Sequence, residues 1–128
     1  MKKLFLFCLL TLSILSCSSS TKENPLSYEK KEALTKGKKL FMNHCSQCHH
    51  ESMEIEMTAP PLEEAVKNRT QSWIKQYILK GGEKSVLEGD SIALELEKEG
   101  WAIMPSFHYL SEEEINNVVS YINHVSQK

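Results

Sequence analysis

The feature that most restricts the fold is a short cluster of cysteines and histidines. Residues 43–52 have the sequence NHCSQCHHES, so two residues separate Cys45 from Cys48 and His49 follows directly. Two thiols at this spacing can bind a metal ion, cycle between dithiol and disulfide, form a structural disulfide, or be consumed in covalent bonds to a cofactor. The rest of the sequence separates these possibilities.

Three of the four possibilities lack support elsewhere in the chain. A structural zinc site takes four ligands, usually as two pairs, and no second cysteine pair follows Cys48. A thioredoxin-like pair belongs to a βαβ unit, whereas no strand pair is predicted here. A disulfide across two residues closes a loop too small to constrain a fold. There remains thioether attachment of a haem group at Cys45 and Cys48, with His49 as the proximal iron ligand.

The apolar pattern predicts an all-α domain. Helical spacing follows Ser27, the expected N-cap, and places Gly37 inside a helix, where a close crossing by another helix would explain it. Ser111 opens a capping box and precedes an apolar stripe near the C-terminus. Three further helices are expected between these two: residues 61–66, residues 71–80 with Thr70 as N-cap and Gly81-Gly82 as the stop, and residues 91–99.

The N-terminus has the pattern of an export signal. Lys2 and Lys3 precede an apolar segment, residues 4–15, that is too short to span a bilayer. The segment ends just before Cys17 in a pattern that resembles a bacterial lipoprotein signal, so Cys17 is expected to carry lipid. An ordinary secretory signal is the alternative. The predicted organisation is a signal peptide (residues 1–16), a flexible tether (17–26) and one folded domain (27–128).

Composition limits the function further. The 128 residues are 41% hydrophobic and 25% charged, which fits one small domain. The formal net charge is −2, and loss of Lys2 and Lys3 with the signal makes the chain more acidic. A nucleic-acid partner is therefore not expected, because it would require a basic surface. The supply of large apolar residues is thin, which favours a cofactor that completes the core.

With these features the chain resembles the class I cytochromes c, from about Leu34 to Ile122. The CSQCH motif is the most specific part, followed by Met104-Pro105 and the C-terminal helix. The resemblance implies a small fold of three to five helices around one covalently bound haem, with the N- and C-terminal helices crossing. The implied site residues are Cys45 and Cys48 for attachment and His49 and Met104 as axial ligands.

Met104 lies in a loop between two predicted helices and matches the ligand methionine of the family. His108, four residues later, is the alternative sixth ligand. The other candidates are disfavoured by position: Met42, His44 and His50 lie beside the motif, Met53 and Met57 lie in a short loop that passes the proximal side, and His124 lies on the C-terminal helix.

The resemblance also implies residues around the haem. In the family a proline carbonyl accepts a hydrogen bond from the ligand histidine, and Pro60 or Pro61 is expected to do so here. Four more residues are expected near the haem or its propionates: Arg69, Trp73, Tyr77 and Trp101. Ordinary core packing is the alternative for the three aromatic residues, and a solvated surface charge is the alternative for Arg69.

These features predict a single-electron carrier rather than an enzyme, exported and facing the periplasm, and anchored by lipid to a bacterial membrane. Its expected partners are redox proteins: an oxidase, a quinol-oxidising complex or a periplasmic reductase. The chain could also be one subunit of an oxidoreductase complex. The alternative function is a gas-binding or peroxidatic c-type haem domain whose sixth ligand is weak or absent.

Overall fold

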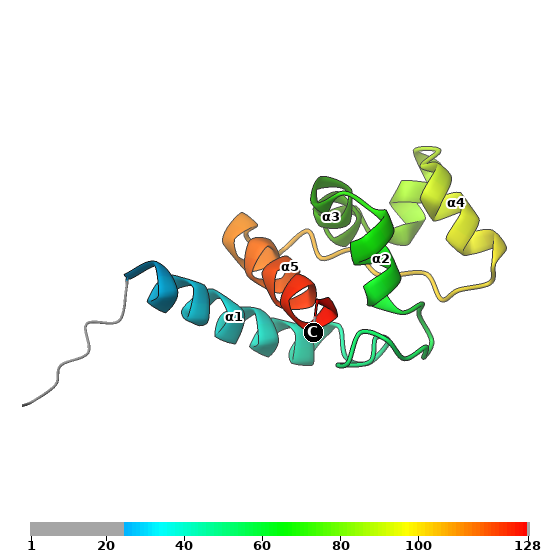
Figure 1. Cartoon of the computed structure of the whole chain (residues 1–128). Helices are drawn as coiled ribbons and strands as arrows, with labels where there is room; N and C mark the ends of the chain where they lie inside the picture. Colours follow the sequence, from blue (N-terminus) through cyan, green and yellow to red (C-terminus); the bar gives the residue numbers. More distant parts are fainter. Residues whose placement is uncertain (1–24, 128) are drawn as a thin grey trace, which may run out of the picture.

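The structure is a computed structural model that describes residues 25–127. This part of the chain forms helices and no strand, so the predicted all-α fold is confirmed. In Figure 1, α1 and α5 lie together on one side and α2, α3 and α4 on the other. The expected signal peptide and Cys17 lie outside the described residues. The helices are α1 (Pro25–His44), α2 (Leu62–Asn68), α3 (Gln71–Leu87), α4 (Ser91–Lys98) and α5 (Glu112–Ser126).

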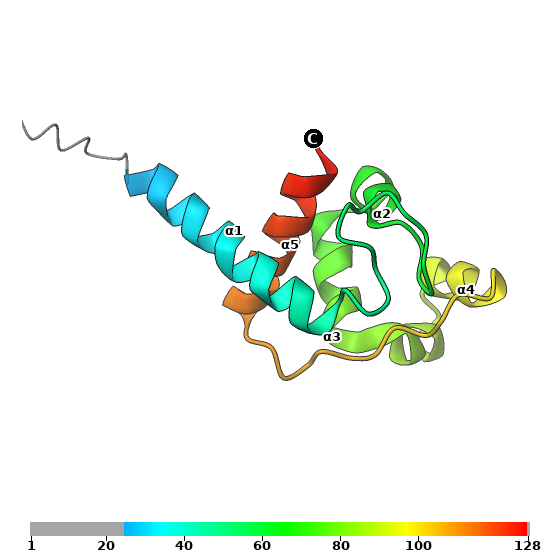
Figure 2. The same cartoon turned by 90° about the horizontal axis from the view of Figure 1, so that it is seen from below.

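Helices α1 and α5 cross at Gly37 (Figure 2), as the sequence predicted. A Cβ atom on Gly37 would lie 2.0 Å from the carbonyl oxygen of Asn117 and 2.9 Å from the Cβ of Tyr121. One turn later Phe41 is completely buried, and its ring centroid lies 5.6 Å from that of Tyr121. The glycine is needed because the two helix backbones approach too closely for any side chain.

Replacing Gly37 with alanine is expected to lower the free energy of unfolding by about 1–3 kcal/mol, the usual cost of overpacking. In an unobstructed helix the same change would raise stability by about 1 kcal/mol, so the sign of the effect is diagnostic. Chemical denaturation of the haem-loaded protein measures it. Lys38→Ala, exposed on the same helix, is the control and should change stability by less than about 0.5 kcal/mol. A more stable Gly37→Ala protein would contradict the crossing.

Helix α5 begins with the predicted capping box. The Ser111 hydroxyl accepts a hydrogen bond from the backbone N–H of Glu114 (3.3 Å), whose carboxylate accepts one from the backbone N–H of Ser111 (2.9 Å). The apolar stripe of α5 then joins Phe41 and Met53 in the hydrophobic core. Its buried apolar members are Ile115, Val118, Val119, Tyr121 and Ile122.

Helix boundaries differ from prediction at three places. Helix α1 begins at Pro25, so Ser27 is not its N-cap and two residues assigned to the tether are helical. Proline is compatible with the first turn because the N–H that it lacks has no partner within the helix there. Helix α2 begins after Pro61 and extends to Asn68. Helix α3 is interrupted at Gly81, where φ is 78° and ψ is 170°, but it resumes and ends only at Leu87.

Candidate haem site

A cavity of about 530 Å³ lies among α2, α3, α4 and the loop before α5. Its volume is within the range of about 300–1,000 Å³ that is usual for cofactor sites in proteins. Apolar side chains form most of its wall. Among the predicted site residues, Cys48 is half-buried and does not line the cavity. Those that line it are Cys45, His49, Pro60, Pro61, Arg69, Trp73, Tyr77, Trp101 and Met104.

The CSQCH segment continues from α1 as a further turn. The backbone N–H of Cys45 donates to the carbonyl of Phe41 (2.8 Å), and that of His49 donates to the carbonyl of Cys45 (3.0 Å). Residues four apart in a helical turn share one face. Cys45 and His49 both line the cavity wall, whereas Cys48 does not. The turn is anchored by the buried end of α1 at Phe41.

His49 is held in the form that can bind a metal. Its Nδ1 atom lies 3.3 Å from the carbonyl oxygen of Pro60, so this nitrogen donates its proton to the backbone. The lone pair is then on Nε2, which is free to coordinate iron. Burial lowers the pKa of His49 and keeps its ring neutral. Of the two candidate prolines, Pro60 provides this carbonyl, whereas Pro61 precedes the first turn of α2.

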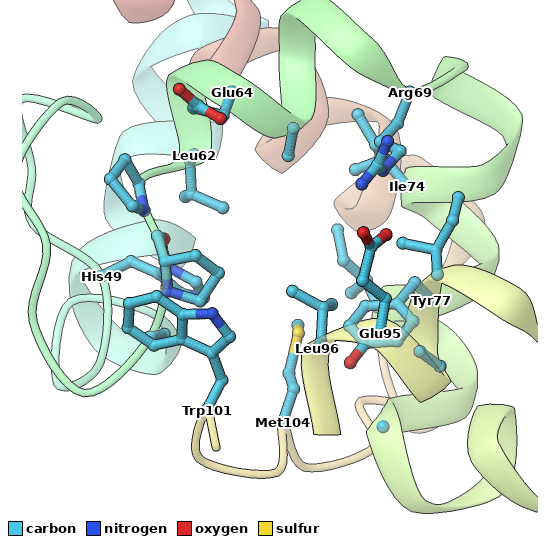
Figure 3. Close-up of a pocket in the computed structure, with 18 of the residues that line it drawn as sticks. His49, Leu62, Glu64, Arg69, Ile74, Tyr77, Glu95, Leu96, Trp101 and Met104 are labelled. Carbon is cyan, nitrogen blue, oxygen red and sulfur yellow. Dashed lines mark hydrogen bonds between the residues drawn. The ribbon is translucent and has the colours of Figure 1, made fainter. Parts of the chain in front are cut away.

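Met104 lies in the loop before α5, with its sulfur directed into the cavity (Figure 3). His108 is exposed and does not line this cavity. It lines a neighbouring surface depression, which Met104 also lines, and its Nδ1 atom lies 3.2 Å from the hydroxyl of Ser106. Met53 is completely buried in the hydrophobic core, and Met57 is exposed. Neither of these methionines lines the cavity.

Charged groups gather at the end of the cavity away from His49. The Arg69 guanidinium and the Glu95 carboxylate point toward one another there (Figure 3). The ring of Tyr77 stacks on that of Trp73 with centroids 4.7 Å apart. Burial raises the pKa of Tyr77, so its phenol stays neutral. At this end Arg69 is the one cationic side chain of the cavity lining within residues 25–127, and the facing Glu95 carboxylate would compete with an acidic ligand edge for it.

Asp90, which the sequence analysis missed, fixes part of this wall. Its carboxylate accepts hydrogen bonds from the backbone N–H groups of Ile92 (3.0 Å) and Ala93 (2.9 Å) and from the indole N–H of Trp73 (2.8 Å). Burial alone would raise the pKa of Asp90, but the hydrogen bonds from Ala93, Trp73 and Ile92 lower it. The ionised carboxylate thus caps α4 and holds a cavity residue of α3. Its place just before Ser91 was a detectable N-cap signal.

The residues of the cavity fit a haem. Burial, and then the neighbouring Cys48, raise the pKa of Cys45 to about 11, so an uncharged sulfur faces the apolar space. Cys45 and Cys48 are free thiols and can both form thioethers. His49 offers a neutral imidazole, Met104 offers a soft sulfur, and Arg69 offers a positive charge suited to propionates.

Comparison with known families agrees with this site. The family model for cytochrome c matches residues 34–126, which is most of the chain. No curated protein and no solved structure matches it. The chain belongs to the cytochrome c family, and its cofactor is covalently bound haem c, for which Cys45, Cys48 and His49 have the characteristic spacing.

Proposed function

We propose that the protein is a monohaem electron carrier in which Cys45 and Cys48 hold the haem and His49 and Met104 ligate its iron. One observation supports this assignment above the others. His49 and Met104 line the same cavity, whereas the alternative ligand His108 lies outside it. Two permanent axial ligands favour electron transfer over binding of gases or peroxide, since those reactions need an open coordination position.

Residues of the chain set the ligand orientation and the reduction potential for electron transfer. Haem c, when bound, supplies an iron that alternates between the ferrous and ferric states. The hydrogen bond from His49 to Pro60 fixes the orientation of the imidazole. The largely apolar wall and a thioether ligand such as that of Met104 both favour the ferrous state, so both raise the reduction potential. The stacked Trp73 and Tyr77 form a rigid wall that limits rearrangement between the two states.

Optical spectroscopy of the purified haem protein tests the proposal. We expect a low-spin spectrum in both oxidation states, a ferric band characteristic of methionine coordination, and slow binding of carbon monoxide. A reversible titration should show one electron per chain. A high-spin spectrum with rapid binding of carbon monoxide would instead support the gas-binding or peroxidatic alternative.

We further propose that the protein is exported, faces the periplasm and is anchored by lipid on Cys17. Support comes from the N-terminal pattern of Lys2, Lys3 and the apolar segment before Cys17, and from the export that is typical of cytochrome c domains. Among residues 25–127, no helix combines the length and the hydropathy needed to cross a bilayer.

A Cys17→Ser variant is expected to leave the membrane fraction while remaining red. Each buried CH₂ of an acyl chain contributes about 0.8 kcal/mol, so two or more chains hold a protein firmly and their loss releases it. Fractionation followed by haem staining measures the distribution. Ser18→Ala, next to the lipidated position, is the control and should stay membrane-bound. Retention of Cys17→Ser in the membrane would contradict the lipid anchor.

The proposed partners are other redox proteins: an oxidase, a quinol-oxidising complex or a periplasmic reductase. Five glutamates and one arginine are among the described residues that line the cavity. This charge favours the approach of a positively charged partner, with association that slows as ionic strength rises. The five glutamates are Glu56, Glu64, Glu95, Glu97 and Glu99.

A further inference from the structure

The interruption of α3 at Gly81 exposes backbone groups that a continuous helix would pair internally. In an uninterrupted α-helix, the N–H of residue 82 would donate to the carbonyl of Ile78, and that of residue 83 to the carbonyl of Leu79. The φ of 78° and ψ of 170° at Gly81 prevent this pattern. These helix groups must therefore find other partners, because buried backbone groups are rarely left unpaired.

Most of these partners belong to the loop that carries Met104. The N–H of Gly82 donates to the carbonyl of Met104 (2.8 Å). The N–H of Phe107 donates to the carbonyl of Ile78 (3.0 Å), and the hydroxyl of Ser106 donates to the carbonyl of Leu79 (2.7 Å). Within α3, the Ser85 hydroxyl donates to the carbonyl of Gly81 (2.7 Å). The break and the loop therefore complete each other's hydrogen bonding.

Steric contact explains why two glycines stand at the break. A Cβ atom on Gly81 would lie 2.7 Å from the backbone nitrogen of Ser106 and 3.0 Å from the carbonyl carbon of Pro105. A Cβ atom on Gly82 would lie 3.2 Å from the backbone nitrogen of Met104. The loop can contact α3 this closely only where the helix has no side chains.

We propose that the Gly81-Gly82 break is a positioning device that fixes the backbone of Met104 and sets how readily an external ligand displaces its sulfur from the iron. The inference rests on the proposed ligation by Met104. Methionine is unbranched and has three rotatable side-chain bonds, so it is a well-directed ligand only where its backbone is held. The bond from Gly82 holds the carbonyl of Met104, and the bonds that Ser106 and Phe107 donate to α3 hold the part of the loop that follows Met104.

Gly81→Ala tests the device, with Gly89→Ala as a matched control. Both glycines have φ near +78°, but a Cβ on Gly89 would meet nothing within 4 Å. Both variants place a side chain at positive φ, but only in Gly81→Ala does the new Cβ also clash with the loop, and movement of the loop relieves that clash. We expect imidazole to bind the ferric haem protein about tenfold more tightly in Gly81→Ala. Its affinity for Gly89→Ala should equal that of the wild type.

Ser106→Ala gives a second test that leaves the helix and its glycines intact, because this side chain is exposed. Loss of its hydrogen bonds to the carbonyl of Leu79 and to Nδ1 of His108 should raise imidazole affinity about fivefold. If imidazole binds Gly81→Ala and Ser106→Ala with wild-type affinity while the ferric methionine band is retained, the positioning role of the break is overturned. The ligation by Met104 is not overturned by that result. An equal rise in Gly89→Ala would also overturn the positioning role. If the wild-type protein lacks that band, both this inference and the ligation by Met104 fail.

Discussion

A Cys45→Ala, Cys48→Ala double variant is expected to lose its covalent haem and most of its helical structure. Without the cofactor, the cavity of about 530 Å³ is no longer filled. At roughly 24 cal/mol per Å³, an empty cavity of this size corresponds to about 13 kcal/mol as an upper limit, since water entry and collapse reduce it. That limit is comparable to the whole stability of a small domain, about 5–15 kcal/mol.

Haem staining after denaturing electrophoresis and far-ultraviolet circular dichroism measure the two losses. Gln47→Ala is the matched control, because Gln47 lies between the two cysteines but is exposed. It should keep the haem and the native helicity. Native helicity in the double variant without haem would mean that the core of α1, α3 and α5 is sufficient by itself.

Met104→His is expected to keep the haem but to lower the midpoint potential by on the order of 100 mV. Imidazole is a stronger donor than a thioether and stabilises the ferric state relative to the ferrous state. Since about 59 mV is a tenfold change for one electron, the redox equilibrium shifts roughly fiftyfold. Potentiometric titration measures the shift. Met57 is exposed and lies outside the cavity, and Met53 lies in the core. Met57→Leu and Met53→Leu should each leave the midpoint potential within a few tens of mV of the wild-type value.

A Met104→Ala variant examines the competing ligand. Because His108 lies outside the cavity and contacts Ser106, we expect Met104→Ala to be high-spin and to bind carbon monoxide rapidly. The double variant Met104→Ala, His108→Ala should behave identically. If only the double variant is high-spin, His108 reaches the iron when the methionine is absent. An unchanged potential and spectrum in Met104→Ala would exclude Met104 as the ligand.

Local signals in the sequence predicted much of the fold. The capping box at Ser111 and the N-cap at Thr70 involve residues within one turn, so their hydrogen bonds follow from spacing alone. Gly37 predicted the helix crossing because a helical glycine needs a packing reason. Ser27 was wrongly predicted as the N-cap of α1, because Pro25 and Leu26, which were assigned to the tether, are already part of the helix.

The remaining features depend on residues far apart in the chain. The glycines at 81 and 82 predicted a helix end, but α3 resumes because backbone groups of residues 104–107 occupy the break. No spacing rule could reveal that partnership. Likewise, Asp90 was a plausible cap for α4, while its bond to Trp73, seventeen residues earlier, depends on how α3 and α4 pack. The spacing of Cys45, Cys48 and His49 predicted the cofactor but could not show that Cys48 lies outside the cavity lining.

The crossing at Gly37 also affects how the protein can form. Gly37 and Asn117, which meet there, are about 80 residues apart, and closing so long a loop makes the contact late and slow. The attachment segment directly follows α1, and the loop of Met104 directly precedes α5. A growing chain therefore exposes Cys45 and Cys48 well before the residues that complete the fold are made. We therefore expect haem attachment to Cys45 and Cys48 to precede closure of the fold by α5.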